Sequence, residues 1–425
     1  MKINIRRTML AGLAFMTISS FWAVYDAVTP LILKNTFHLN EVLNGAVMAM
    51  DNVLALFLLP VFGMISDKTN TKLGKRIPYI IAGTILASMA MIFMPFADNV
   101  QSLPLFFVAT GLVLLFMSFY RTPAVALTPD ITPRQLRSKA NAVVMLMGTF
   151  GVVYALVVVK FLVKDGADGR PNYMPLFISI VAFMIVGLVV QVATVRENKW
   201  TEIAKEQDKD FVEDTPNNEG KKLDKAKMKS LIFLLFSVAF WFMAYNAVNS
   251  AFSRYSMVVL NFENGEYATY ILVATLAAVA SYVPIGFFSQ RFGRKKCILA
   301  GVLGLIIAFG VSVFFKEGGF LFKIVFALVG ISWASINVNS YPMVVEIASD
   351  GDVGKYSGYY YTFSMAAQVV TPILSGVFLQ YVSYKSLFPY GFVFSVLAFI
   401  TMTQVRHGDI VTDKKKSILE HLDVD

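Results

Sequence analysis

The sequence of 425 residues is poor in cysteine and histidine. Its one cysteine, Cys297, cannot form an intrachain disulfide bond. Its three histidines, His38, His407 and His421, all fall in predicted loops or in the tail. The chain also lacks a phosphate-binding loop, a His-rich metal cluster and a nucleophile elbow. We therefore do not expect an enzyme, a metal site or a bound cofactor.

Charge is scarce as well, at 15% of residues, whereas 56% are hydrophobic and the mean hydropathy is +0.62. A soluble protein of this length would be less apolar. A membrane core about 30 Å thick takes roughly 20 apolar residues per helix, and the chain lacks the short alternating segments of a transmembrane barrel. We predict twelve transmembrane helices, over residues 8–33, 42–66, 77–97, 103–128, 140–163, 174–195, 230–256, 267–289, 296–315, 320–347, 358–380 and 386–405.

The net charge of +9 is distributed unevenly between the two sides of the predicted membrane. With the N-terminus inside, 28 of the 37 Lys and Arg residues fall on cytoplasmic segments, which is the positive-inside bias. This pattern predicts a multi-pass protein of the cell (inner or plasma) membrane with both termini cytoplasmic, and it gives a nucleic-acid partner no support. The first apolar run is too long for a signal peptide and is predicted to be retained as a helix.

The longest polar segment, 196–229, carries nine basic and nine acidic residues and divides the predicted helices six and six. We interpret it as a cytoplasmic linker rather than a domain. The predicted organisation is therefore an N-terminal six-helix bundle (1–195), this linker, a C-terminal six-helix bundle (230–405) and a cytoplasmic tail (406–425).

Three patterns recur in the two halves at an offset of about 220 residues. The string FWAVYDAV beginning at Phe21 matches FWFMAYNAV beginning at Phe240. The loop with Gly63, Asp67 and Gly74 to Arg76 matches the loop from Gly286 to Lys295, because both contain glycines and a basic cluster. In the third pattern a proline precedes an aspartate, as Pro123 and Asp130 in the first half and as Pro342 and Asp350 in the second. Parallel repeats of this kind are related by an axis along the membrane normal and enclose a site near the midplane.

The two loops resemble a motif of the major facilitator superfamily. GFFSQRFGRKK (286–296) is similar to the G-x-x-x-D-x-x-G-R-K pattern that follows the second and eighth helices of that family. GMISDKTNTKLGKRIPYI (63–80) is a longer form, in which six residues separate Asp67 from Gly74. This longer spacing is similar to the sucrose-transporter-like branch and to the related glycoside-pentoside-hexuronide:cation symporters.

Two further strings, YRTPAVALTPD (120–130) and NVNSYPMVVEIASD (337–350), look like the same branch. The resemblance covers nearly the whole chain. It implies an all-α integral membrane protein, with twelve transmembrane helices in two six-helix pseudo-symmetric bundles. It also implies a secondary transporter that works by alternating access.

The sequence departs from the melibiose-type sodium symporters of that group. They carry two acids in helix 2, where this chain has Ala55 and Leu59, and another acid at the position of Arg121. A sodium site of that type is therefore not expected. We expect a proton rather than sodium as the coupling cation.

Three charges lie inside predicted spans: Asp26, Asp51 and Arg121. A charge at the centre of a spanning helix costs about 2.5–3.5 kcal/mol, so each needs a reason. One reading is a structural ion pair that locks the N-terminal half. However, two acids and one base cannot all pair, and the remaining acid could carry a proton. We predict that Asp51 pairs with Arg121 and that Asp26, nearer the outer face, is the titrating partner.

Three tryptophans, Trp22, Trp241 and Trp333, fall in the middle of predicted spans rather than at the interfaces. They either pack in the core or stack on the apolar face of a sugar ring. Amides and hydroxyls share helix faces nearby, and amides suit hydroxyl-rich ligands although they also bridge membrane helices. The predicted substrate-binding residues are Trp22, Trp241, Asn246, Asn249, Trp333, Asn337, Tyr341, Tyr361 and Gln368.

The two repeated loops are predicted to act as hinges and gates on the cytoplasmic side. The residues expected to do so are Gly63, Asp67, Gly74, Lys75, Arg76, Gly286, Arg291, Gly293, Arg294 and Glu346. Arg254 lies near the outer end of its predicted span and is expected to gate or to snorkel to the interface.

Taken together, these features predict a proton-coupled symporter of a sugar or glycoside. A drug/proton antiporter of the same superfamily and a sodium-coupled sugar symporter are the alternatives. The expected partners are a small molecule and the lipid bilayer, and the chain is expected to act as a monomer.

Overall fold

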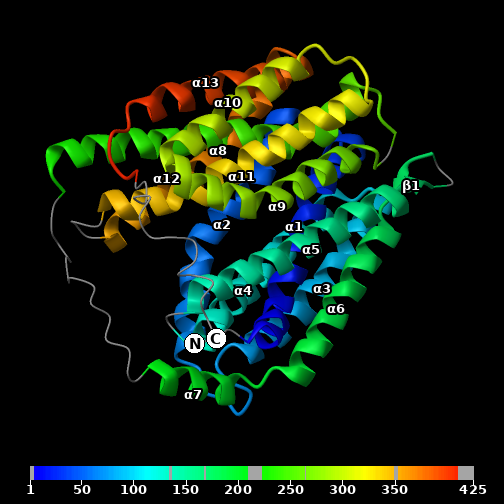
Figure 1. Ribbon diagram of the computed structural model, residues 1–425. Helices are drawn as coiled ribbons and strands as arrows, with labels where there is room; N and C mark the ends of the chain where they lie inside the picture. The colour runs from blue at the N-terminus through cyan, green and yellow to red at the C-terminus, as the bar shows by residue number, and fades with distance from the viewer. Residues whose placement is uncertain are drawn as a thin grey trace.

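The computed structural model describes residues 4–133, 136–166, 169–208, 223–263, 265–348 and 353–409. In these residues, twelve helices are long and apolar enough to span a membrane, which confirms the predicted fold class. They are α1 (Ile5–Asn35), α2 (Glu41–Asp67), α3 (Ile77–Asn99), α4 (Leu103–Asp130), α5 (Arg137–Leu162), α6 (Met174–Thr194), α8 (Lys225–Val259), α9 (Tyr267–Phe292), α10 (Arg294–Ser312), α11 (Phe320–Ala348), α12 (Val353–Tyr381) and α13 (Leu387–Thr403). Figure 1 shows them as two groups of long helices.

The helix boundaries lie within five residues of the predicted spans and follow from local capping chemistry. Asn40 caps α2, because its side chain accepts a hydrogen bond from the N–H of Leu43 at 2.8 Å. Asp224 caps α8 in the same way, through the N–H of Ala226 at 3.2 Å. The helices α3, α4 and α6 each have a proline in their first turn, where the missing N–H has no cost.

Among the described residues, four short elements accompany the spanning helices. The helix α7 (Glu197–Asp208) occupies part of the segment that composition predicts to be a linker. The strands β1 (Lys164–Asp165) and β2 (Pro171–Asn172) form an antiparallel pair, and the 3-10 helix η2 (Tyr384–Ser386) precedes α13. Residues 209–222, Asp350 and the tail beyond 409 lie outside the described residues, and the predicted domain limits stay predictions.

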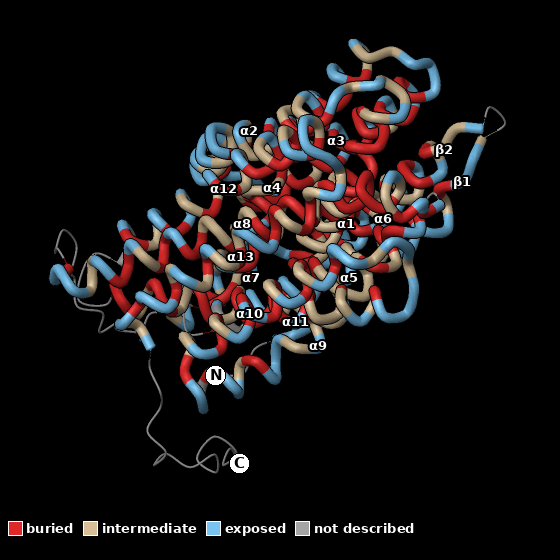
Figure 2. The backbone as a smooth tube through the Cα atoms, turned by 90° about the horizontal axis from the view of Figure 1, so that it is seen from above, coloured by how far each residue is buried: buried red, intermediate tan, exposed pale blue. Residues whose placement is uncertain are grey.

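Each half of the chain packs mainly with itself. In the first half, α1 packs on α5 and α6, and α3 packs on α4 and α6; in the second, α8 packs on α12 and α13, and α10 packs on α11 and α13. Buried residues follow these helix contacts, whereas exposed residues cover the outer faces (Figure 2). We call the end of the molecule at which α1 begins and α13 ends the proximal end, and the opposite end the distal end.

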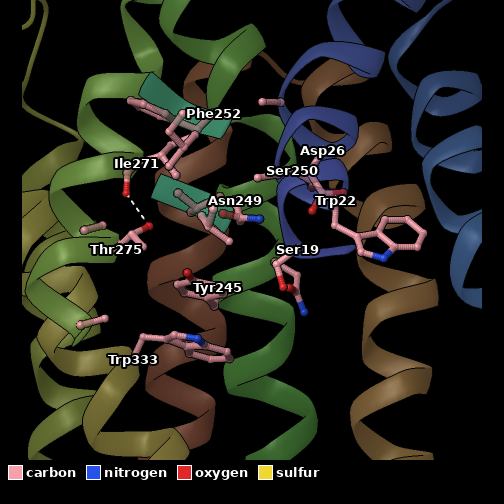
Figure 3. Close-up of a pocket in the computed structure, with 18 of the residues that line it drawn as sticks. Ser19, Trp22, Asp26, Tyr245, Asn249, Ser250, Phe252, Ile271, Thr275 and Trp333 are labelled. Atoms are coloured by element: carbon pink, nitrogen blue, oxygen red, sulfur yellow. Dashed lines mark hydrogen bonds between the residues drawn. The ribbon is translucent and has the colours of Figure 1, made fainter. Parts of the chain in front are cut away.

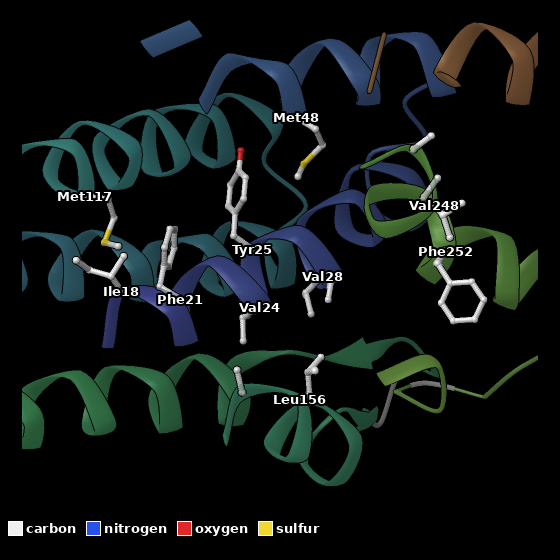
Figure 4. Close-up of a cluster of buried hydrophobic side chains, with 14 of the residues drawn as sticks. Ile18, Phe21, Val24, Tyr25, Val28, Met48, Met117, Leu156, Val248 and Phe252 are labelled. Atoms are coloured by element: carbon white, nitrogen blue, oxygen red, sulfur yellow. The ribbon is translucent and has the colours of Figure 1, made fainter. Parts of the chain in front are cut away.

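The two halves touch through α2 with α12, α5 with α9, and α1 with α8. A Cβ atom at Gly45 of α2 would collide with the carbonyl of Pro372 in α12, so only glycine permits this approach. Side chains of α1 and of α8, including Val24 and Phe252, belong to one apolar cluster (Figure 4). All hydrogen bonds and ion pairs that join two described residues of different halves lie at the distal end.

Candidate functional site

A cavity of about 490 Å³ lies between the two halves. Its volume falls within the range typical of small-molecule sites. Helices α1, α2, α4 and α5 line one side, and α8, α9, α11 and α12 line the other. Figure 3 shows Ser19, Trp22 and Asp26 on α1, across from Tyr245 and Asn249. The three α1 residues recur at three- and four-residue steps and share one helix face.

All three charges predicted inside the membrane, Asp26, Asp51 and Arg121, line this cavity, and all come from the first half. The expected Asp51–Arg121 ion pair is absent, because no described carboxylate lies within 4.0 Å of Arg121. The Arg121 guanidinium instead lies 5.5 Å from the ring centroid of Trp22, within cation–π range. Asp51 accepts a hydrogen bond from Asn52 at 2.8 Å, whereas Asp26 has no hydrogen-bond partner among the described residues.

The second half contributes aromatic and amide side chains. Tyr245 of α8 and Trp333 of α11 stack with their ring centroids 3.8 Å apart and their planes within 4° (Figure 3). Phe242 meets Trp333 edge-on at 5.3 Å. Asn246 and Asn249 line the cavity on the same helix as Tyr245. Sequence reasoning missed Tyr245, although its place four residues before Asn249 puts it on the amide-bearing face.

Two of the lining side chains are buried donors without a partner. The indole Nε1 of Trp22 and the amide Nδ2 of Asn246 have no hydrogen-bond partner among the described residues. Buried polar atoms in proteins are almost always satisfied. These donors can therefore be satisfied by a bound molecule that carries hydrogen-bond acceptors.

Four predicted substrate residues lie outside this cavity: Trp241, Asn337, Tyr341 and Tyr361. Trp241 is fully buried in the core of the second half, so packing rather than stacking accounts for it. The amide of Asn337 donates to the carbonyl of Trp333 at 3.1 Å, one helical turn earlier. Tyr341 contacts Tyr360 and Tyr361 instead. The other five, Trp22, Asn246, Asn249, Trp333 and Gln368, line the cavity.

At the proximal end of the first half, Arg76 is the centre of a polar network that joins residues of the predicted gate. Its guanidinium bonds to Asp130 through Nε at 2.8 Å and also contacts Ser66 and Asp67. Lys75 lies 3.3 Å from Asp130. Burial alone would lower the pKa of Arg76, but its bonds to the two carboxylates outweigh burial and raise that pKa above its ordinary value. All of these partners belong to one half, so the network stiffens that half in this conformation.

The side chain of Glu197, the first residue of α7, closes the start of α3. Its carboxylate accepts hydrogen bonds from the N–H groups of Lys75 (2.8 Å), Arg76 (3.0 Å) and Ile77 (2.9 Å). A helix N-terminus has unpaired donors and a partial positive charge, so a carboxylate is favoured there. A side chain at Gly74, whose φ is +115°, would collide with Glu197.

Replacing Glu197 with alanine is expected to destabilise the protein by about 1–2 kcal/mol, because three N–H donors, two of them buried, lose their acceptor. Thermal unfolding in detergent measures this effect. Glu202→Ala, on the exposed face of the same helix, is the matched control and should change little. Equal losses in the two variants would show that Glu197 is not a cap.

The second half has a looser version of the same gate. Arg294 lies 3.9 Å from Glu346 and donates to the carbonyl of Pro342 at 3.3 Å. The N–H of Lys295 donates to Asp409 at 3.3 Å, in the role that Glu197 has in the first half. Gly293 has a φ of +94°, which a residue with a side chain adopts rarely. Arg291 is exposed and lies 5.4 Å from the ring of Phe292, and a Cβ atom at Gly286 would meet open space.

Of the two roles expected for Arg254, gating and snorkelling, the structure excludes the second. Arg254 is 3% exposed and forms an ion pair with Glu41 of α2 at 2.9 Å. Glu41 could not be predicted as its partner, because Glu41 falls just before the predicted second span.

Solved transporter structures share this fold. The nucleoside transporter NupG superimposes with a TM-score of 0.70 at 16% identity, over 95% of this chain and 100% of that chain. A bacterial homologue of the iron transporter ferroportin, in an inward-facing state, superimposes with a TM-score of 0.69 at 13% identity, over 95% of this chain and 99% of that chain. A bacterial homologue of the human lysosomal transporter Spinster superimposes with a TM-score of 0.65 at 16% identity, over 95% of both chains. At such low identity these similarities concern the fold.

Sequence comparisons identify the family. An uncharacterized symporter of Synechocystis is 24% identical over 169 residues, which are 37% of this chain and 29% of that relative. The matched region thus spans less than a third of the relative's length. A family model described as MFS/sugar transport protein matches residues 9–403, nearly the whole chain. The chain belongs to this family, and is a multi-pass membrane transporter of the major facilitator superfamily.

Proposed function

We propose that this transporter is a proton-coupled symporter of a sugar or glycoside. The observation that carries the proposal is the division of labour in the cavity. The first half supplies two carboxylates and one guanidinium that form no ion pair with any described residue, and the second half supplies stacked aromatic rings and amides. One half can thus couple an ion while both halves hold the substrate.

The substrate side of the proposal rests on Tyr245, Trp333 and the unpaired donors. The flat face of an aromatic ring packs well against the apolar face of a sugar ring, while indole and amide N–H groups donate to hydroxyl oxygens. Trp22 and Asn246 offer such donors, and Asn249 and Gln368 add amides that both donate and accept. A neutral, hydroxyl-rich ligand suits this lining better than a lipophilic cation.

The coupling side rests on Asp26. Asp26 has no ion-pair or hydrogen-bonding partner among the described residues, and it lines the cavity between the halves. Such a carboxylate can carry a proton, and a change in its exposure to water would load and release that proton. The positive-inside pattern supports an orientation with the distal end outside the cell. Because the hydrogen bonds and ion pairs between described residues of the two halves lie at that end, this conformation corresponds to the inward-facing state of an alternating-access cycle.

Uptake into proteoliposomes tests the proposal. Labelled mono- and disaccharides are offered under an imposed proton gradient or an imposed sodium gradient. We expect the proton gradient to drive accumulation of at least one sugar and the sodium gradient to have no effect. Accumulation under sodium alone would support sodium coupling instead. Proton-driven export of lipophilic cations, with no sugar uptake, would support the drug/proton antiporter.

A nucleoside is a second candidate substrate, because the face of the Tyr245–Trp333 pair would also stack on a planar base. The fold shared with a nucleoside transporter is compatible with this alternative. Nucleosides therefore belong in the ligand panel, and thermal protection by nucleosides but not by sugars would favour them.

A further inference from the structure

The distal end of the molecule holds a group of polar side chains that the proposed transport site does not use. Glu41 forms ion pairs with Arg254 (Oε2 to Nε, 2.9 Å) and with Lys34 (Oε1 to Nζ, 3.6 Å). The hydroxyl of Tyr384 donates a hydrogen bond to Glu41 and accepts one from Lys34. We refer to Lys34, Glu41, Arg254 and Tyr384 as the distal cluster.

The distal cluster joins the two halves of the transporter. Lys34 and Glu41 belong to the first half, at the end of α1 and the start of α2, whereas Arg254 and Tyr384 belong to the second. The N–H of Val42 adds another bond across the junction, to the side chain of Gln380 at 3.2 Å. These bonds cannot persist if the halves separate at the distal end.

Two charges of the distal cluster, those of Glu41 and Arg254, are almost fully removed from water, whereas the Lys34 side chain is partly exposed. Glu41 is 5% exposed and Arg254 is 3% exposed. Glu41 is the one carboxylate that pairs with the two cations among the described residues. A buried charge that loses its partner is strongly unfavourable, whereas the same charge is well tolerated once water reaches it. The cluster is therefore stable either fully closed and paired, or open and hydrated.

The cluster lies directly beyond the cavity. Arg254 follows Ser250 of the cavity wall by one turn of α8, and Asn44 precedes Met48 of the wall by one turn of α2. Arg254 donates to Asn44 at 3.4 Å, and Asn44 donates to the carbonyl of Pro30 at 2.8 Å. Pro30 is one turn beyond Asp26 on α1. These contacts close the distal side of the cavity.

We propose that the Glu41–Arg254 ion pair is a latch between the two halves, which holds the distal end closed and separates when that end opens to water. The inference rests on alternating access in the proposed function, and it requires neither a sugar substrate nor a proton. Loss of the Glu41 charge would leave the buried Arg254 and the partly exposed Lys34 without their shared anion. Loss of the Arg254 charge would leave Glu41 paired to Lys34 within one half. Neutralising Glu41 should therefore open the distal end further than neutralising Arg254.

Distances between spin labels at the distal end test the latch. We would place labels at Val100→Cys, in the loop between α3 and α4, and at Glu317→Cys, in the loop between α10 and α11, in a Cys297→Ser background. Both label sites are exposed and lie in different halves. Double electron–electron resonance then gives the populations of short and long distances. We expect Glu41→Gln to raise the ratio of long to short about tenfold, and Arg254→Gln to raise it less.

Two further variants complete the test. The exchange Glu41→Arg with Arg254→Glu should restore the short distance, because the carboxylate at position 254 would face Lys34 and the guanidinium at position 41. Glu263→Gln is the matched control: this acid is exposed at the same end, and its side chain makes no ion pair with a described residue. It should leave the distances unchanged.

The latch is excluded if Glu41→Gln, folded as judged by its elution and unfolding temperature, keeps the wild-type distances. It is equally excluded if the charge exchange stays as open as the single variants. If Glu41→Gln does not fold, Arg254→Gln and the exchange decide the question. The labels report conformation without any transport assay, so the outcome is independent of whether sugar uptake or proton coupling is found.

Discussion

Asp26→Asn is expected to abolish proton-driven accumulation of substrate while leaving its exchange across the membrane intact. Asparagine keeps the size of aspartate and resembles its protonated form, which also donates and accepts hydrogen bonds, but it cannot release or accept a proton. One pH unit corresponds to 1.36 kcal/mol, so coupling to one proton can sustain about tenfold accumulation per unit. In Asp26→Asn the concentration ratio across the membrane should fall to one.

The measurement is paired uptake and counterflow in the same proteoliposomes. Uptake under an imposed pH difference reports coupling, whereas exchange of labelled for unlabelled substrate reports binding and the movement of the loaded carrier. Asp51→Asn is the comparison variant, because Asp51 already accepts a hydrogen bond from Asn52 and Asp26 has no such partner among the described residues. Full accumulation by Asp26→Asn would contradict the assignment, and loss of accumulation in Asp51→Asn alone would transfer it to Asp51.

Trp333→Ala is expected to weaken substrate binding about 10- to 100-fold, corresponding to roughly 1.4–2.8 kcal/mol. The substitution removes the ring that stacks on Tyr245 at 3.8 Å, so the platform for the substrate loses both area and rigidity. Protection against thermal unfolding, titrated with the sugar that uptake identifies, gives the affinity.

Trp241→Phe is the matched control for this prediction. Trp241 is a tryptophan of the same half, but it is fully buried away from the cavity. Its replacement should lower the unfolding temperature and leave the affinity of the folded protein unchanged. Equal affinity losses in the two variants would place the substrate elsewhere in the cavity.

Part of the site could be predicted from single helices. Asp26, Asp51 and Arg121 were identified because a charge in a spanning segment needs water, a partner or a cavity, and all three line the same cavity. Trp22 was identified because it falls in the middle of a span rather than at an interface. In both cases the decisive information lies within a few turns of one helix.

The remaining features depend on contacts between distant segments. Trp241 and Trp333 look alike in sequence, and only the packing of α8 and α11 puts one in the core and the other on the cavity wall. The position of Arg254 near the end of a span is typical of a residue that snorkels to the interface, but the packing of α2 on the second half brings Glu41 into an ion pair with it. The composition of the linker gave no indication that Glu197 caps α3.

By itself the sequence determined the twelve spans, the two-half repeat and the charges of the cavity. Lipid forces every spanning segment to be apolar and helical, so that information is written locally along the chain. Only the tertiary structure decided which face of each helix borders the cavity, which acid lacks a partner and which ion pair closes the distal end. Those outcomes depend on contacts between side chains that are far apart in sequence, and a hydrophobic pattern does not specify such contacts.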